Sequence, residues 1–506
     1  MTMSSLRPVA AVSEADVERG KHWLVRDAAW ASLTGSLSGG VVLVAFALAL
    51  DAGPLAIGML AAIPFLAQIA QLPGIALIER LRQRKRLAVW VITASRVVIL
   101  SIALLPFVPD RRLAITLLVA AQVAICLAGS LGACAVNSWL HQLIRPEGMG
   151  AFFSRRLLWG TLLGSIGTLL AGQLIEHATG RDRLFAFAAA FVAAAFAGFT
   201  SSWYLARTPE PVMTGEPSRE RLADTLRRPL RDTNFRNLLI FLGSWTVASN
   251  LAAPFLTVYL MSQLGLSLGV VTALGVLSQL ANAMALYLWG RLSDRIANKS
   301  VLAVALPVYF VCTAALVLAY RPDRPMLGLA LLFALHVVMG AAAGGIGLAS
   351  GNLGLKLAPQ GQGTAYLAMV GLVSAIGGGL APLVAGAVAE SFDARQLSFV
   401  MRWEEPGLRS ELPVFAIAHW EFLFIISALL GLYVLHRLSR VVESGEVDER
   451  FVVQEFAIEA ARSVDSLSSI GGALGFLFPF RRFVLWRTQR LRGEPARRAE
   501  GGWRGR

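Results

Sequence analysis

The sequence predicts an all-α membrane protein with twelve transmembrane helices, and composition, segment length and basic-residue distribution support this fold class. Of 506 residues, 56% are hydrophobic and only 15% are charged, whereas soluble domains carry about 25% charged residues. The apolar residues come in blocks of about 20, the length that an α-helix needs to cross about 30 Å of hydrocarbon. A soluble fold could not bury so large an apolar excess.

Twelve apolar blocks follow one another in two groups of six, separated by a polar stretch rich in Pro and Arg. They are Ala28–Leu50, Pro54–Ile78, Leu87–Phe107, Leu113–Val136, Leu157–Ile175, Leu184–Leu205, Leu238–Met261, Gly269–Trp289, Val301–Tyr320, Met326–Ala343, Ala365–Ala389 and Phe422–Leu435. The predicted organisation is therefore an N-terminal tail (1–27), a six-helix bundle (28–206), a linker (207–237), a second six-helix bundle (238–440) and a C-terminal tail (441–506).

Basic residues accumulate on one side of this topology. If the N-terminus is cytoplasmic, 36 of the 46 Lys and Arg residues lie in cytoplasmic segments and 9 lie on the other side. Because cytoplasmic loops carry an excess of basic residues, both termini and the linker are predicted to be cytoplasmic, and Ser391–Trp420 to be a periplasmic loop. The net charge of +14 is then a topology signal, and no nucleic-acid partner is expected.

The C-terminal tail has the pattern of a segment that lies on the membrane surface. An amphipathic stretch, Glu449–Ser469, precedes the apolar residues Ile470–Phe480 and the basic residues Arg481–Arg492. Eleven apolar residues are too few to span a bilayer. We therefore expect an interfacial segment held by anionic lipid.

The two groups of six helices show a weak internal repeat. Glu79-Arg80 and Asp294-Arg295 lie 215 residues apart, each after the second helix of its group. Asn137 and Asn352 are separated by the same offset. Because six crossings return a chain to its starting side, the repeats are predicted to be parallel.

The loop after the eighth apolar block resembles a motif of the major facilitator superfamily of secondary transporters. Gly290, Asp294 and Arg295 match its Gly-x-x-x-Asp-Arg pattern, although Ala297 stands where a second Gly is usual. The first-half copy is more eroded, with Glu79 and Arg80 in place of Asp-Arg. The resemblance covers roughly residues 28–435 and implies two six-helix bundles that work by alternating access.

In that family the motif carboxylate holds the cytoplasmic side closed by accepting hydrogen bonds from a helix N-terminus of the other bundle. Such N-termini present free N–H groups and a positive dipole. The resemblance implies that Asp294 faces the helix start near Ser154, and Glu79 the one near Thr364. The alternative is that both acids are ordinary turn residues.

Two ionisable residues lie deep in the predicted helices. A charge in hydrocarbon is costly, so Arg96 and His336 are candidates for the substrate pathway. His336 could also carry a coupling proton, since its unperturbed pKa lies near physiological pH. The alternatives are a buried neutral imidazole for His336 and a structural pairing for Arg96.

Uncharged polar and aromatic residues complete the candidate set. Helices 1, 4, 7 and 10 line the cavity of the resembled fold, which makes Asn250, His336 and Trp245 the first pathway candidates, with Gln279, Asn282 and Gln68 beside them. Hydrogen bonds between helices, worth about 0.6 kcal/mol each, are the competing explanation for these side chains.

The sequence contains no catalytic, metal-ligand or nucleotide-binding pattern, so neither an enzyme nor a cofactor is expected. The predicted function is a secondary active or facilitative transporter for a small molecule, monomeric and embedded in a bacterial inner membrane. The alternative is a non-transporting receptor or assembly factor built on the same scaffold. An intact cavity lined by polar groups would favour transport.

Overall fold

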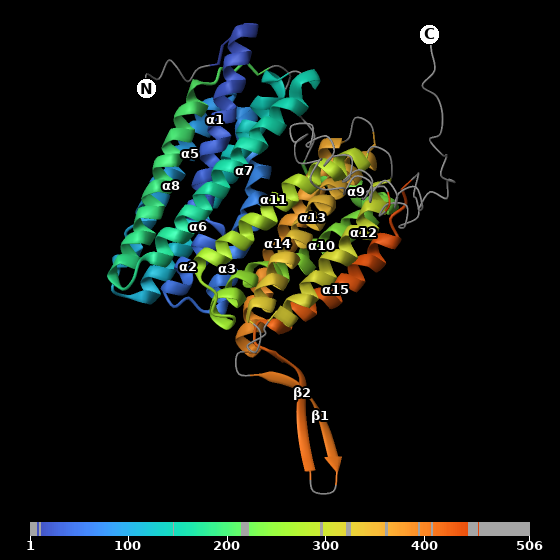
Figure 1. The fold of residues 1–506 in the computed structure, drawn as a ribbon. Helices are drawn as coiled ribbons and strands as arrows, with labels where there is room; N and C mark the ends of the chain where they lie inside the picture. Colours follow the sequence, from blue (N-terminus) through green and yellow to red (C-terminus); the bar gives the residue numbers. More distant parts are fainter. Residues whose placement is uncertain are drawn as a thin grey trace, which may run out of the picture.

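The computed structural model describes residues 8–9, 12–144, 146–213, 222–293, 297–319, 325–359, 363–392, 395–405, 408–443 and 454. Within these ranges twelve helices are long and apolar enough to cross a membrane. They stand in two groups (Figure 1), as the predicted fold class requires. Apart from residue 454, the tail segments predicted for 449–492 lie outside the described residues.

The first-half helices are α1 (Glu14–Ser38), α2 (Gly40–Ala49), α3 (Pro54–Leu66), η2 (Ala67–Ala70), α4 (Gln71–Leu81), α5 (Arg84–Ile102), η3 (Leu105–Phe107), α6 (Arg111–Leu143), α7 (Pro146–His177) and α8 (Arg181–Arg207). The later elements are α9 (Leu222–Arg231), α10 (Thr233–Val258), η4 (Tyr259–Gln263), α11 (Leu268–Ser293), α12 (Asn298–Ala315), η5 (Leu316–Ala319), α13 (Pro325–Lys356), α14 (Gly363–Phe392), β1 (Gln396–Glu405), β2 (Leu408–Ala418) and α15 (Glu421–Ser439). We call the side on which α1 begins and α15 ends the terminal side.

The first helix begins well before the apolar block that predicts it. Ser13 caps α1 by accepting a hydrogen bond from the backbone N–H of Asp16, and such a cap satisfies an N–H that lacks an intrahelical acceptor. The helix thus begins fourteen residues before the apolar block at Ala28, because hydropathy detects the apolar span and misses its polar extension. Asp27 lies inside the helix and is buried.

The first membrane span is broken in its second half. Gly39 separates α1 from α2, and Gly40, the first residue of α2, has φ of +51°. Backbone of this kind is left-handed, where a side chain is disfavoured and glycine is not. The break leaves the first N–H groups of α2 without acceptors in the preceding turn.

The two halves approach each other most closely on the side opposite the termini. There α3 packs against α14, and α7 packs against α11. A Cβ on Gly58 would clash with the carbonyl oxygen of Pro382, and one on Gly386 would lie 2.8 Å from the carbonyl oxygen of Pro54. Glycine at these positions lets the backbones touch. Toward the terminal side the groups diverge (Figure 1).

The predicted loop at 391–420 contains a β-hairpin that projects away from the helices on the opposite side (Figure 1). β1 and β2 are antiparallel, with Gln396 opposite Ala418 and Glu405 opposite Leu408. The sequence carried a signal for this element, because apolar and β-branched residues flank the dipeptide Pro406-Gly407. The expectation of twelve helices did not include it.

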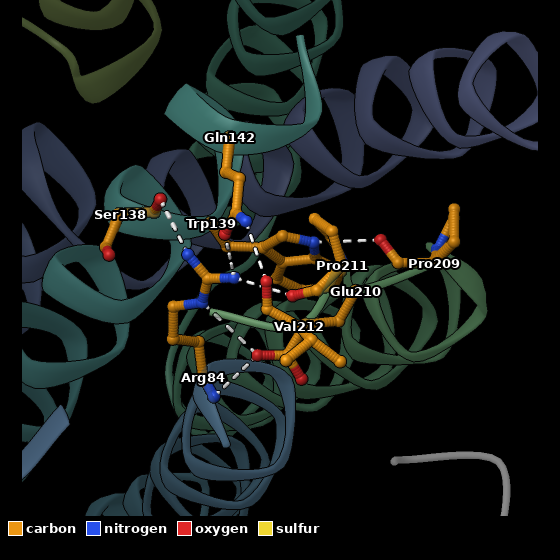
Figure 2. Close-up of polar contacts among 8 residues, drawn as sticks. All are labelled: Arg84, Ser138, Trp139, Gln142, Pro209, Glu210, Pro211 and Val212. Atoms are coloured by element: carbon orange, nitrogen blue, oxygen red, sulfur yellow. Dashed lines mark hydrogen bonds and ion pairs between the residues drawn. The ribbon is translucent and has the colours of Figure 1, made fainter. Parts of the chain in front are cut away.

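A buried polar network attaches the start of the linker to the first bundle (Figure 2). Oε1 of Glu210 accepts hydrogen bonds from the backbone N–H of Arg84 at 2.8 Å and from its Nε at 3.3 Å. Burial raises the pKa of Glu210, and hydrogen bonds from the Lys85 N–H and from Arg84 oppose that rise. The remaining guanidinium acceptors are the Ser138 carbonyl, Gln142 Oε1 and the Pro211 carbonyl.

The second bundle repeats this arrangement after its last helix. Glu443 accepts hydrogen bonds from the Lys299 N–H at 2.8 Å, from Asn298 Nδ2 at 3.1 Å and from Lys356 Nζ at 2.8 Å. Burial alone would raise the pKa of Glu443, but the bonds from Lys356, Lys299 and Asn298 together hold it below its ordinary value. In each half, a carboxylate after the sixth span caps the N-terminus of the third.

Candidate functional site

A cavity of about 770 Å³ lies between α1, α7 and α11, where the first half meets the second. It runs along α1 from Ala28 to the helix break and along α7 from Phe153 to Thr168. The lining residues are Ala28, Ala31, Ser32, Gly35, Ser36, Gly39, Gly40, Val41, Phe153, Arg156, Leu157, Gly160, Thr161, Gly164, Thr168, Gly275, Val276 and Gln279. Its size is that of a small-molecule site.

Glycines shape the wall between α1 and α7. A Cβ on Gly160 would lie 2.7 Å from Oγ of Ser32, and one on Gly164 would lie 3.6 Å from atoms of the same serine. The two helices can therefore pack closely on one face. Gly35 and Gly40 have open space where a Cβ would stand, and both line the cavity. Gly160 and Gly164 thus allow α7 to pack closely against α1, whereas Gly35 and Gly40 leave the cavity open.

A charged cluster adjoins the mouth of the cavity. Arg156 Nη2 of α7 lies 3.8 Å from Oδ2 of Asp27, and the other oxygen of Asp27 accepts a hydrogen bond of 2.6 Å from Ser201 of α8. Arg96 of α5 lies near enough to Asp27 to interact with it electrostatically. The cluster therefore contains one carboxylate, Asp27, and two guanidinium groups, Arg156 and Arg96, and its net charge is positive.

Gln279 lines the cavity from α11 and is exposed there. It is the one predicted pathway residue among the described cavity residues. Asn282 lies one turn further along α11, where a Cβ on Gly344 of α13 would lie 2.9 Å from its carbonyl oxygen. Gln68 is exposed in η2. Arg96 packs its side chain onto Gly198 of α8 and lies outside the cavity lining.

The three first-choice candidates are not among the described residues that line this cavity. Trp245 packs edge-on against Tyr309 of α12, with ring centroids 5.0 Å apart. Asn250 donates a hydrogen bond of 2.9 Å to the Thr246 carbonyl of its own helix. His336 is buried, and its Nδ1 lies 2.8 Å from the Leu332 carbonyl one turn away.

The predicted terminal-side gate is described only in part. Gly290 ends the apolar part of α11, while Asp294 and Arg295 lie outside the described residues. Glu79 is half-buried near the end of α4 and Arg80 is exposed. The helix start expected to receive Asp294 carries Ser154, which is exposed in α7.

A carboxylate contact between the two halves lies on the opposite side. Oε2 of Glu176, at the end of α7, accepts a hydrogen bond of 2.6 Å from the backbone N–H of Gly269 in the first turn of α11. Nearby, a Cβ on Gly172 would clash with Thr272. A carboxylate on a helix N-terminus is favoured by the dipole as well as by the hydrogen bond.

Sequence reasoning missed Asp27, Arg156 and Glu176 as site residues. Asp27 and Arg156 fall outside the predicted apolar blocks, although a charge that flanks a block can belong to the same helix. Glu176 directly follows the predicted block that ends at Ile175. Their partners are distant in the sequence, so hydropathy alone could not pair them.

Comparison with known proteins places this architecture in a family. The family model described as Major Facilitator Superfamily matches residues 28–382 and 246–486. No curated protein sequence matches significantly.

Solved transporter structures share the fold at low sequence identity. The nucleoside transporter NupG aligns with a TM-score of 0.59 and 15% identity, over 84% of this chain and 98% of its own. A bacterial homologue of the iron transporter ferroportin, in an inward-facing state, gives 0.58 and 14%, over 85% and 99%. A bacterial homologue of the human lysosomal transporter Spinster, inward-facing and occupied, gives 0.58 and 13%, over 89% and 98%.

Proposed function

The chain belongs to the Major Facilitator Superfamily, and from that premise we propose that this integral membrane transporter carries a small solute between its two helix bundles by alternating access. We further propose that the terminal side is cytoplasmic, in a bacterial inner membrane, and that the bundles comprise residues 28–206 and 238–440. The excess of basic residues on the terminal side supports this orientation.

The observation that carries the proposal is the asymmetry of the contacts between the halves. On the opposite side, backbone meets backbone at Gly58 and Gly386, and Glu176 bonds to Gly269. Nearer the terminal side the halves enclose a cavity of about 770 Å³. A carrier that is closed on one side and holds a cavity toward the other has the geometry of an inward-facing state.

The same physical device can act at both gates. Glu176 joins the end of α7 to the start of α11 when the opposite side is closed. Asp294, with Glu79 as its first-half equivalent, would join helix ends on the terminal side when that side closes. The two carboxylate contacts would then alternate, each stabilising one closed face.

The cavity also bears on the alternative of a non-transporting receptor or assembly factor. That alternative predicts a cavity lost to side-chain packing. The space between α1, α7 and α11 instead has polar groups on each wall, among them Ser32, Thr161 and Gln279. The geometry therefore supports transport of a small molecule.

Paired distance measurements test alternating access. Spin labels at Ser154 and Leu355 report on the terminal side, and labels at His177 and Arg395 report on the opposite side; all four positions are exposed. We expect the terminal-side distance to shorten, and the opposite-side distance to lengthen, in a second population. If both distances stay single-valued in lipid under pH and sodium gradients, alternating access is wrong.

A further inference from the structure

The cavity between α1, α7 and α11 carries positive charge without a matching negative lining. Among the described residues that line it, Arg156 is the one charged residue, and none is Asp or Glu. The Arg156 side chain is 23% exposed. Its guanidinium carries five N–H donors, and none of them forms a hydrogen bond with a described residue. The Asp27 oxygen, at 3.8 Å, is too far away for a hydrogen bond.

Asp27 cannot neutralise the cluster. Its Oδ1 is engaged by Ser201 at 2.6 Å, and its charge is shared between Arg156 and Arg96. The Nε of Arg96 is buried without a hydrogen-bond partner among the described residues. One carboxylate against two guanidinium groups leaves an excess of one positive charge beside the cavity mouth.

The inner end of the cavity carries no charged side chain among the described residues. Gly39, Gly40 and Val41 line it at the break between α1 and α2. α2 is ten residues long, has no acidic residue in its first turn and has no side-chain cap. Its free N–H groups are oriented donors at this end, but the last carbonyls of α1 lie at the same break, so the two helix dipoles oppose each other and the charge of the cavity comes from Arg156.

These observations have one physical reading. A solute held in a low-dielectric cavity must find its counter-charge on the walls, since an unpaired charge there is costly. A cation would meet Arg156, and no carboxylate lines the cavity among the described residues. We propose that the transported solute is an anion whose carboxylate, phosphate or sulfonate oxygens pair with Arg156, displacing Asp27 from that arginine. This inference rests on the transport function proposed above.

A charge-selective labelling experiment tests the inference without knowledge of the solute. Gln279, on the α11 wall, is changed to Cys after the three native cysteines are replaced. The probes are the anionic ethylsulfonate and the cationic ethyltrimethylammonium methanethiosulfonate reagents, with rates normalised to those of a free thiol. We expect the anionic reagent to be favoured by about tenfold in the Arg156 protein, because a unit charge acts strongly at low dielectric.

Two variants should move this ratio in opposite directions. R156Q removes the cavity charge and should abolish the preference. D27N removes the competing carboxylate and should increase it. Misfolding cannot produce both results. R155Q is the matched control, because Arg155 is the exposed neighbour outside the cavity lining and should leave the ratio unchanged.

Binding and uptake then separate this inference from the proposed function. The probes are succinate and glycerol 3-phosphate as anions, glucose as a neutral solute and choline as a cation. A solute that binds the folded protein raises its melting temperature. We expect an anion to do so, and R156Q to weaken that binding by roughly thirtyfold or more, with R156K retaining part of it.

Three outcomes decide the matter. A labelling preference for the anionic reagent that R156Q abolishes supports the inference. It does so even if none of the four probes enters proteoliposomes, because that second result counts only against transport of these solutes. Uptake of glucose or choline with no labelling preference overturns the inference and leaves transport standing. Anion binding unchanged in R156Q also overturns it, because the charge would then lie elsewhere.

Discussion

Glu210 and Arg84 lie 126 residues apart in the sequence, and their contact joins the segment after α8 to the start of α5. One carboxylate oxygen of Glu210 caps the start of α5 through the Arg84 N–H and also bonds to the Arg84 guanidinium. Both side chains are almost fully buried, at 0% and 2% exposure. The contact holds the end of α8 against the start of α5, so it belongs to the rigid body of the bundle.

Replacing Glu210 with Ala should destabilise the protein by about 3–5 kcal/mol, because a buried guanidinium loses its charged partner. Denaturant unfolding in mild detergent, followed by Trp fluorescence, measures the change. E390A is the control, since Glu390 is exposed near the end of α14. Equal unfolding free energies for E210A and E390A would show that the buried contact contributes nothing.

The two capping carboxylates should respond to pH in opposite directions. The folded-state pKa of Glu443 is lowered, so its contribution to stability is present above its unfolded pKa, near 4.5, and is lost as pH falls below that value. The folded-state pKa of Glu210 is raised, so the stability that it contributes falls as pH rises from about 4.5 through the folded pKa.

This contrast is measured by comparing wild type with E443Q and with E210Q between pH 4 and pH 7. The advantage of wild type over E443Q should shrink toward pH 4, whereas its advantage over E210Q should shrink toward pH 7. Slopes of the same sign for both variants would contradict the assignment. Lys356, half-exposed beside Glu443, makes the first slope sensitive to salt.

Replacing Glu176 with Gln should weaken closure of the side opposite the termini. Gln can still accept the Gly269 N–H bond, so the variant loses only the charge, which contributes about 0.3–1 kcal/mol for an exposed side chain at a helix N-terminus. The ratio of closed to open population on that side should therefore fall by roughly twofold to fivefold. Spin-label distances between His177 and Arg395 measure the shift. E390Q, on the same side, should leave the distribution unchanged, and an identical distribution in E176Q would remove this contact from the gate.

Replacing His336 with Ala should leave gradient-driven uptake intact. The imidazole is buried, lies outside the described cavity lining and already has a partner in the Leu332 carbonyl. The loss should appear in stability, at about 1–3 kcal/mol. Uptake in proteoliposomes with and without a pH gradient checks this expectation. If H336A abolishes only the gradient-driven component, the histidine carries the coupling proton and its placement as packing is wrong.

The sequence by itself determined the twelve spans and the fold class. Hydrocarbon imposes a minimum length and an apolar composition on every crossing segment, so each span can be recognised from its own residues. The family followed from the same local information, through the repeat and the motif at Gly290 to Arg295. None of these conclusions required knowledge of which helices touch.

The tertiary structure decided the site. Asp27 with Arg156, Arg84 with Glu210 and Glu176 with Gly269 are pairs whose members lie on different segments of the chain, and each partner alone looks like an ordinary residue near a helix end. The ends of the helices could not be predicted from hydropathy either, because α1 and α7 extend beyond their apolar spans through polar turns. A bilayer dictates which residues cross it, but packing between distant segments dictates which side chains meet.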